Sequence, residues 1–251
     1  MKALATSIVL VAVMVVGTTI AQAAIISINF DDPTRENPPH DVRSGRTAGV
    51  IDVSNWNNVT PGGSGSQPNL MDSNGLPTTA DVTWGGSNPA TWTTGVVIND
   101  ADADDNDRMM KGYLDYGGNG QGSTITIDIQ EIPYDVYDLY LYHESQGGDG
   151  RVMGVSLDGG ATWVYTKDET GPFGGTFTED HHPDVAGAEA GAGGNCILWT
   201  GLTADTLSIV TQGQGGGTVR SPVQGMQITP EPATLALLAA GAAATLIRRK
   251  K

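Results

Sequence analysis

Short runs in which apolar and polar residues alternate recur along the middle of this 251-residue chain. In the clearest run, Ile125, Ile127 and Ile129 are separated by polar residues. A period of two sends one set of side chains into a core and the other toward solvent, which is typical of a β-strand. Similar runs contain Ile26, Ile28 and Phe30; Tyr137, Leu139 and Leu141; Met153, Val155 and Leu157; Leu207 and Ile209; and Val223–Ile228. No segment of the body keeps a helical period, so the sequence predicts an all-β fold.

Turn signals between these runs indicate how the strands connect. Asp158-Gly159-Gly160 lies between two apolar runs and predicts a hairpin. Many short strands with glycine-rich turns are typical of two packed sheets, so we expect a jelly-roll-like β-sandwich. We also expect its first and last strands to pair or to lie close together. Three stretches have the composition of loops, namely Asp31–Arg46, Pro61–Pro68 and Phe173–Gly194.

The first 23 residues have the three parts of a secretory signal. Lys2 supplies a positive charge, Ile8–Val16 is apolar, and Ala21-Gln22-Ala23 is a small-residue cleavage sequence. We therefore expect a signal helix that is removed, leaving a chain that begins near Ala24. The alternative, an N-terminal membrane span, is disfavoured because the apolar run is short.

The last 23 residues also have three parts. Pro230-Glu231-Pro232 keeps the backbone extended, because proline fixes φ and restricts the residue before it. The uncharged run Ala233–Ile247 predicts a short apolar helix, and it falls below the roughly 20 residues that span a bilayer comfortably. The positive-inside rule places the basic end in the cytoplasm. That end is Arg248, Arg249, Lys250 and Lys251.

This tail resembles the PEP-CTERM protein-sorting signal of Gram-negative bacterial envelope proteins, since the motif, the apolar run and the basic end follow in that order. The resemblance implies export by the secretion machinery, a transient stay in the inner membrane, and cleavage near Pro230, Glu231 and Pro232 by an exosortase-type protease. The alternative is an ordinary C-terminal membrane anchor. The predicted division is a signal peptide at 1–23, a β-sandwich body at 24–228 and a sorting tail at 229–251. The final location is expected to be the cell surface or the extracellular matrix.

The body between these two ends is strongly acidic. The chain has 13 basic and 28 acidic residues, and five of the basic and one of the acidic residues belong to the two ends, which leaves the body at about −19. Such a surface repels nucleic acid and favours cations, so no nucleic-acid partner is expected. The single cysteine, Cys196, has no partner for an internal disulfide, and its apolar neighbours predict a buried strand residue.

A run of aspartates at 100–107 is the first candidate site. Carboxylates at alternate positions of a tight loop can converge on one hard cation, and calcium accepts six to eight oxygen ligands in irregular geometry. An EF-hand is excluded, because Asp105 and Lys111 stand where that motif needs glycine and glutamate. The alternative is a solvated acidic loop that binds nothing. The candidate ligands are Asp100, Asp102, Asp104, Asp105 and Asp107.

Histidines offer a second, weaker candidate. His181 and His182 lie among acidic residues, and such a set can bind zinc. Adjacent histidines point apart in an extended chain, however, so an acidic loop is the favoured interpretation. His40 and His143 stand alone in the sequence and belong to no pattern.

Aromatic side chains are the remaining candidates, because saccharide rings stack on exposed tyrosine or tryptophan. Tyr140 and Tyr142 fall on the face of their run opposite Leu139 and Leu141. If that face meets water, the two tyrosines form a carbohydrate platform; if a second layer covers it, they are core. The tryptophans are expected to be mostly core residues.

Three classes of function remain open. Trp56-Asn57-Asn58, Ala80–Trp84 and Tyr134–Tyr140 resemble the β-sandwich bodies that often precede PEP-CTERM tails, and whose activity is generally unassigned. The favoured interpretation is therefore a non-enzymatic envelope or matrix protein, associated with exopolysaccharide. The second is a calcium-assisted carbohydrate-binding module. The third is a secreted glycan hydrolase, which needs two facing carboxylates that nothing in the sequence selects.

Overall fold

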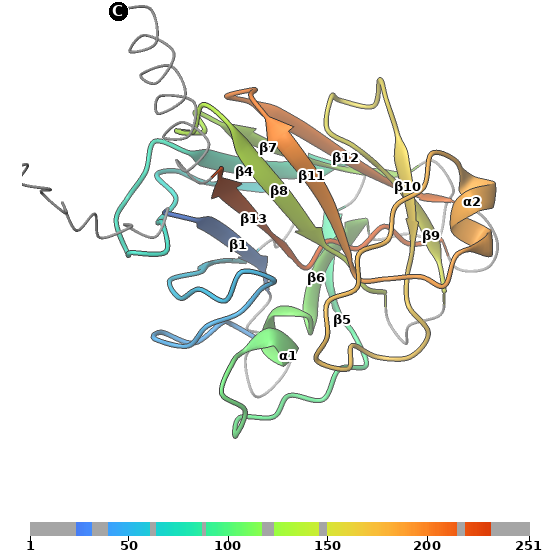
Figure 1. The fold of residues 1–251 in the computed structure, drawn as a ribbon, viewed down its shortest axis with the longest axis horizontal. Helices are drawn as coiled ribbons and strands as arrows, with labels where there is room; N and C mark the ends of the chain where they lie inside the picture. Colours follow the sequence, from blue (N-terminus) through green and yellow to red (C-terminus); the bar gives the residue numbers. More distant parts are fainter. Residues whose placement is uncertain are drawn as a thin grey trace, which may run out of the picture.

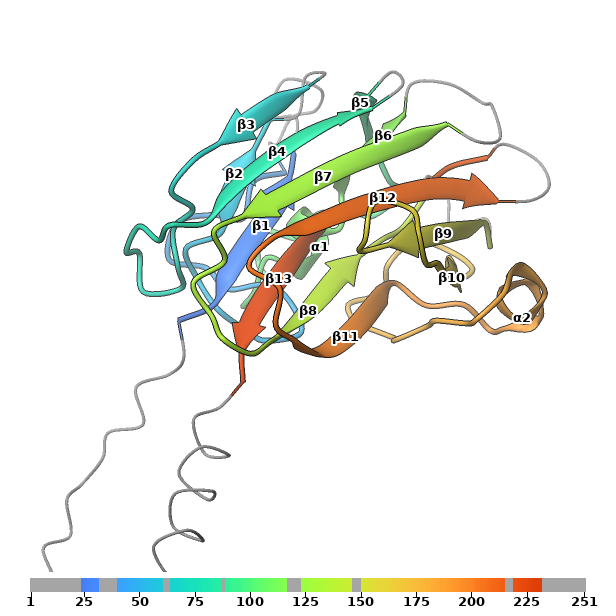
Figure 2. The ribbon, with the colours of Figure 1, turned by 90° about the horizontal axis from the view of Figure 1, so that it is seen from above.

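Two β-sheets face one another in a computed structural model of the chain (Figures 1 and 2). The structure describes residues 24–31, 40–60, 64–86, 89–116, 123–145, 150–214 and 219–231. The predicted signal helix and the predicted C-terminal apolar helix lie outside these residues. Among the described residues, no helix combines the length and the apolar character needed to cross a bilayer.

The strands divide into a five-stranded sheet, a six-stranded sheet and a separate pair. The first sheet has the order β11 (Cys196–Leu202), β8 (Tyr137–Tyr142), β13 (Gly225–Pro230), β1 (Ile26–Phe30), β2 (Asn57–Val59). The second has the order β10 (Val164–Lys167), β9 (Val152–Ser156), β12 (Leu207–Gln214), β7 (Thr124–Gln130), β4 (Asp81–Gly86), β3 (Gly65–Gln67). The pair is β5 (Pro89–Thr93) with β6 (Gly112–Tyr116), and the described residues also form two short helices, α1 (Asn106–Met109) and α2 (Val185–Ala190).

Eight of these strands pair in a nested order. The first strand, β1, pairs with the last, β13; β7 pairs with β12, β8 with β11, and β9 with β10, all antiparallel. The β1–β13 and β8–β11 pairs lie in one sheet and the other two pairs in the second sheet. A long hairpin wound around itself in this way is a jelly roll, so the predicted fold class and the predicted pairing of the terminal strands are confirmed.

The main core lies between the two sheets, on the faces that the alternating pattern predicts. In β7, Ile125, Ile127 and Ile129 are fully buried, whereas the residues between them are half-buried. The predicted hairpin is also present, because Val164 of β10 pairs with Val155 of β9. Burial of these branched and long aliphatic side chains is the main term that stabilises such a domain.

The chain ends meet within one sheet. Gly225 of β13 lies against β1, where a Cβ atom would come 2.3 Å from the carbonyl oxygen of Ile28, so only glycine fits this approach. The last strand then continues to Pro230. This strand therefore runs two residues past residue 228, and the division of the chain into body and tail at that point stays a prediction.

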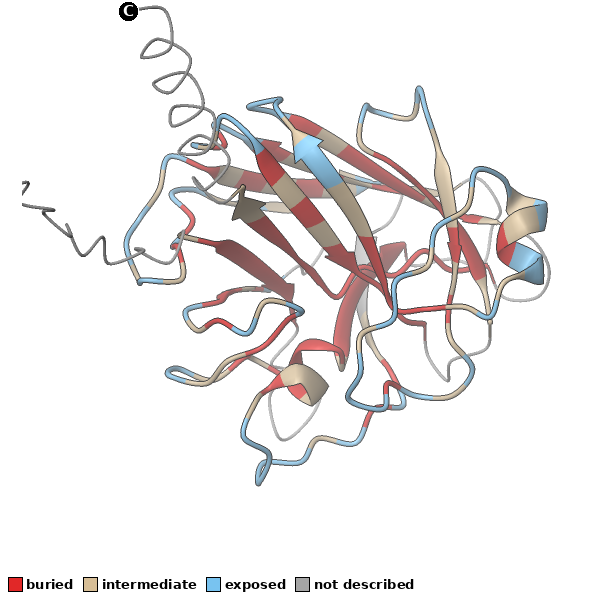
Figure 3. Cartoon of the chain, viewed as in Figure 1, coloured by how far each residue is buried: buried red, intermediate tan, exposed pale blue. Residues whose placement is uncertain are grey.

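A further layer of loops covers the outer face of the five-stranded sheet. It consists of the segments 40–56 and 173–180 together with α1, and it encloses a second, smaller core. Burial is continuous along β1, whereas exposed residues gather in the loops, on α2 and at the far end of β11 (Figure 3). The second core consists of Val42, Ala48, Trp56, Val96, Met109, Met110, Tyr142, Phe173 and Cys196.

Candidate functional site

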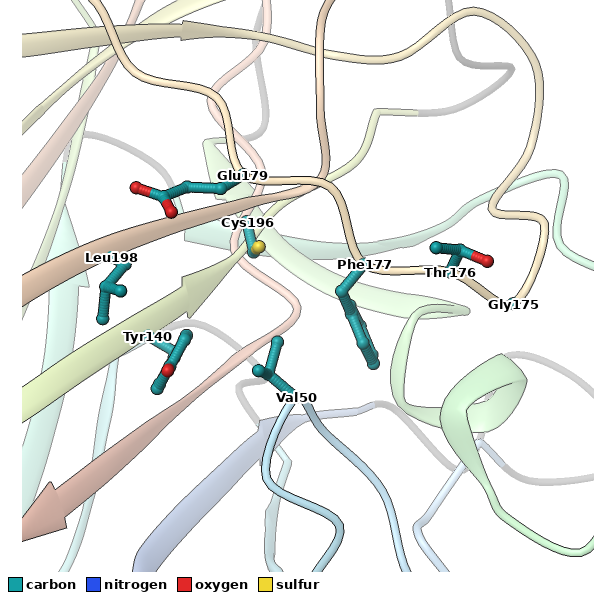
Figure 4. Close-up of a pocket in the computed structure, with 8 residues that line it drawn as sticks. All are labelled: Val50, Tyr140, Gly175, Thr176, Phe177, Glu179, Cys196 and Leu198. Carbon is teal, nitrogen blue, oxygen red and sulfur yellow. The ribbon is translucent and has the colours of Figure 1, made fainter.

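A pocket opens where the covering loops meet strands β8 and β11. Its volume is about 450 Å³, which lies within the usual range for small-molecule sites. Figure 4 shows that the lining side chains come from the two strands, from the turn at Val50 and from the segment 175–179. The lining residues are Val50, Tyr140, Gly175, Thr176, Phe177, Glu179, Cys196 and Leu198.

The β-sheet register brings Tyr140 and Tyr142 to this region. Tyr140 lies opposite Leu198, and Tyr142 lies opposite Cys196, on the outer face of the sheet. Tyr140 remains partly exposed and lines the pocket. A carbohydrate platform at Tyr140 stays a prediction.

Tyr142 has a different place: of the two alternatives, a solvent-exposed platform does not hold for it, and it is a core residue. It is fully buried, because the loop layer covers this part of the face. Its hydroxyl accepts a hydrogen bond from the Val50 backbone N–H at 2.8 Å and donates one to Gln227 Oε1 at 2.5 Å. Burial raises the pKa of Tyr142 well above its ordinary value. Tyr142 thus fixes the turn that carries Val50 and supports one wall of the pocket.

One carboxylate, Glu179, lies among the lining residues of the pocket. The neighbouring thiol of Cys196 is a poor nucleophile, because burial, followed by the charges of Glu179 and Glu169, raises its pKa to about 12. Cys196 is 3% exposed and begins β11, so the prediction of a buried strand cysteine is confirmed. The pocket thus combines aromatic surface from Tyr140 and Phe177 with the carboxylate of Glu179.

The acidic run at 100–107 forms a loop next to α1, and arginines neutralise it. Arg43 contacts the fully buried carboxylate of Asp105 through Nε and Nη2, with Nη2–Oδ1 at 2.6 Å. Arg108 contacts Asp100 in the same manner, with Nη2–Oδ1 at 2.5 Å. The hydrogen bonds from Arg108, followed by the charges of Arg108 and Arg43, lower the pKa of Asp100.

The other three aspartates of the run point to local partners. Asp102 accepts a hydrogen bond from the side chain of Asn99 at 2.6 Å, and Asp104 accepts one from the Asn106 backbone at 3.2 Å. Asp107 accepts from the Arg108 backbone at 2.8 Å, and burial raises its pKa. Across the described part of the chain, no three His, Cys, Asp or Glu side chains lie together in a way that could hold a metal ion. Calcium at this loop stays a prediction.

The histidines have separate carboxylate partners. His181 Nδ1 lies 3.2 Å from Glu179 Oε1, and His182 Nε2 lies 2.9 Å from Asp180 Oδ1. The two rings therefore point to different acids, as expected for neighbours in an extended segment. His40 also has an acidic partner, since its Nδ1 lies 3.1 Å from Asp31 Oδ1.

His143 belongs to a buried polar chain that sequence reasoning missed. Its Nδ1 lies 3.3 Å from Asp168 Oδ1, and its Nε2 lies 3.0 Å from the Thr166 hydroxyl, which in turn contacts Asp180. Ser145 donates to the second oxygen of Asp168. His143, Ser145 and Thr166 are all fully buried, so this hydrogen-bonded arrangement belongs to the interior of the fold and stabilises it.

The sorting motif begins within the last strand. Pro230 is the final residue of β13 and lies opposite Tyr137 of β8. The backbone N–H of Glu231 donates to the carbonyl oxygen of Val136 at 3.0 Å. The remaining predicted sorting residues lie outside the described residues: Pro232, Arg248, Arg249, Lys250 and Lys251.

Comparison with known families supports the identity of this tail. Residues 229–251 match the model of the PEP-CTERM protein-sorting motif. This match covers the tail alone, so it describes how the chain is sorted and says nothing of what the body binds.

Comparison with solved structures adds little for the body. The chain is similar to an exo-β-1,3-galactanase from Phanerochaete chrysosporium in its structure with galactose, at 18% identity and a TM-score of 0.30. A structure of a variant of this enzyme with β-1,3-galactotriose gives 17% identity and a TM-score of 0.31. In both cases 66% of this chain and 29% of the enzyme chain are covered, so the chain spans less than a third of that enzyme. No curated protein matches the sequence.

Proposed function

We propose that this chain is a non-enzymatic protein of the bacterial cell surface or extracellular matrix. The observation that carries the proposal is the PEP-CTERM motif at 229–251, which begins within the last strand of a folded body. The motif supports export and processing by exosortase, a membrane protease. The secretion machinery and, for a short time, the inner membrane are the other partners that this route requires.

Several features of the body support a binding role over a catalytic one. The pocket beside Tyr140 has one carboxylate among its lining residues, whereas glycoside hydrolysis generally uses two across the scissile bond. A second cavity is lined by Asp72 and a third by Asp52, each again with a single carboxylate. Among the described residues that line these three cavities, the hydrolase alternative therefore finds no pair of facing acids.

The first prediction tests sorting. Replacing Pro230, Glu231 and Pro232 together by alanine should abolish C-terminal processing, because the exosortase then loses the sequence that the tail presents. Fractionation of the producing bacterium and intact-mass measurement of the protein check this. The control is Pro172→Ala, at an exposed proline of the body. A triple variant that is trimmed and released like the wild type contradicts the proposal.

Saccharide binding at the pocket is the second candidate function. Tyr140 and Phe177 supply aromatic surface there, and sugar rings pack on such faces while their hydroxyls bond to polar groups at the rim. The body charge of about −19 and the presence of Glu179 favour a neutral over an acidic polysaccharide, because like charges repel.

The second prediction tests this pocket. Tyr140→Ala should weaken retention in gels that contain a soluble neutral β-glucan by about three- to tenfold, which is the usual worth of one aromatic contact. Gels with alginate serve as the acidic comparison, and gels with calcium or with a chelator test whether calcium assists. The control is Trp163→Ala, at a half-buried aromatic residue of the β9–β10 hairpin. Equal retention of wild type and Tyr140→Ala removes the pocket from consideration.

A further inference from the structure

Both ends of the mature body are held by one short connection, the segment between β7 and β8. The hydroxyl of Tyr134 donates a hydrogen bond to the carbonyl oxygen of Ala24 at 2.6 Å. Two residues later, the carbonyl oxygen of Val136 accepts the N–H of Glu231 at 3.0 Å. Figure 2 shows that β1 begins and β13 ends at the same end of the sandwich. We call Tyr134, Val136 and Tyr137 the terminal clamp.

The register explains why proline is tolerated inside this clamp. In an antiparallel ladder, successive residues turn their N–H groups to opposite sides. Because the N–H of Glu231 points to β8, the nitrogen of Pro230 points to the β1 side. There the last β1–β13 pair is Ile26 with Ile228, so the ladder already ends before the proline. A missing N–H at Pro230 therefore leaves no gap in the sheet.

The clamp places the start of the sorting motif within the folded body. Thr229 and Pro230 pair with β8, Glu231 is bonded to Val136, and all three are half-buried. Proteases generally bind substrates as extended strands through backbone hydrogen bonds, and a segment already paired in a sheet has to open before it can be cut. No spacer separates the sheet from the motif in the sequence.

We propose that the folded body restricts processing to peptide bonds on the C-terminal side of Glu231. This inference rests on the proposed function, because it assumes that an exosortase acts on the tail. In the cleavage step, the peptide bond that follows Glu231 or a later residue breaks between its carbonyl carbon and the nitrogen of the next residue. The acyl group passes to water or to an amine acceptor, and the tail leaves with a new amino terminus.

The proposal has a direct structural readout. In the full-length protein, amide hydrogen exchange at Glu231 should be slowed relative to an unstructured peptide of the same sequence, because its N–H is bonded to Val136. Exchange at the unprotected rate overturns the clamp.

The decisive experiment measures where and how fast the tail is cut in the producing bacterium. Intact-mass measurement of the mature wild-type protein should give a C-terminus at Glu231 or later. A short Gly-Ser spacer inserted between Thr229 and Pro230 should allow cleavage before Glu231 and raise the processing rate several-fold. The control places the same spacer between Gly159 and Gly160, in the β9–β10 turn.

The outcomes separate this inference from the proposed function. A mature wild-type protein that ends before Glu231 overturns the inference and leaves sorting intact. A spacer variant that is cut at the same bond and at the same rate as the wild type also overturns it. If neither form is processed and both remain whole, the proposed function fails, and the inference fails with it.

Discussion

The Glu144→Gln variant should unfold at a higher temperature than the wild type at pH 8, and the two proteins should melt together near pH 4.5. Glu144 follows β8 and is fully buried under the loop layer. Its Oε1 accepts the Phe173 N–H at 2.9 Å, whereas its Oε2 has no hydrogen-bond partner in the described structure. The side chain of Gln224 bonds the backbone N–H and carbonyl of Glu144, so this residue cannot move to solvent easily.

The physical reason is the cost of a buried charge. Burial raises the pKa of Glu144 from its usual 4.5 to about 8, and the charges of Asp168 and Glu169 act in the same direction. The folded protein thus binds this proton more tightly than the unfolded chain does. The stability that results is complete below pH 4.5 and is lost as the pH rises toward 8.

The expected effect is large. A difference of this size between the folded and the unfolded pKa corresponds to about 4 kcal/mol, or roughly 10 °C in melting temperature for a domain of this length. Glutamine keeps the acceptor for Phe173 and carries no charge at any pH. Melting temperatures measured from pH 4.5 to pH 8 check the prediction, with Glu189→Gln, at an exposed glutamate, as the control. Parallel curves for wild type and Glu144→Gln contradict it.

The sequence predicts the inner faces of the sandwich well, because burial on one face leaves a period of two. Ile125, Ile127 and Ile129 are an example, and the jelly-roll pairing of the two ends follows from many short strands of this kind. The predicted hairpin at Gly159 is present for a similar reason, since its turn residues are local signals.

The outer face of the five-stranded sheet could not be predicted in this way. Asn29 of β1 and Gln227 of β13 are polar and fully buried, because loops with no period of their own cover them. Tyr142 is buried for the same reason, and its alternation with Leu141 looks like that of a solvent-facing residue. Alternation of apolar and polar residues indicates that one face of a strand is buried and the other is exposed. It therefore does not predict burial correctly where both faces of the strand are covered.

The second limit on prediction from the sequence is that it does not show contacts between distant segments. His143 follows β8, whereas Thr166 lies in β10 and Asp168 follows that strand, so the three meet only through the tertiary fold. The strand β3 lies within the segment Pro61–Pro68, which has the composition of a loop. Its backbone is held as a strand by pairing with β4, which the local sequence does not reveal. Likewise, Arg43 meets Asp105 only because the fold brings these distant residues together.

The pair of Arg43 and Asp105 gives the second large prediction. Arg43→Ala should lower the free energy of unfolding by about 3 kcal/mol or more, because it leaves a buried carboxylate without its main counter-ion. Arg43 is 32% exposed and Asp105 is fully buried, so the loss arises at the aspartate. Burial acts to raise the pKa of Asp105, but the hydrogen bonds from Arg43 outweigh it and hold that pKa below its usual value.

The sign of the pH dependence follows from this direction. A depressed carboxyl pKa contributes stability that is present above the unfolded value, near pH 4, and is lost as the pH falls through the folded value. Wild type and Arg43→Ala should therefore differ most in melting temperature near neutral pH, by roughly 10 °C, and should converge in acid. Thermal melts from pH 3 to pH 7 check this convergence.

Two further variants decide whether the buried charge is the cause. Arg46→Ala removes a cation whose Nε lies 3.6 Å from Asp105, beyond hydrogen-bond distance, and should cost less than about 1 kcal/mol. The double variant Arg43→Ala with Asp105→Asn should recover part of the lost stability. Asparagine carries no charge, and its side-chain oxygen still accepts the hydrogen bond from the backbone N–H of residue 43. Thermal melts of the wild type with calcium and with a chelator complete the set. Coincident melting curves agree with arginine as the counter-ion of this loop. A rise in melting temperature with calcium, together with no loss of stability in Arg43→Ala, shows instead that a metal ion is the counter-ion.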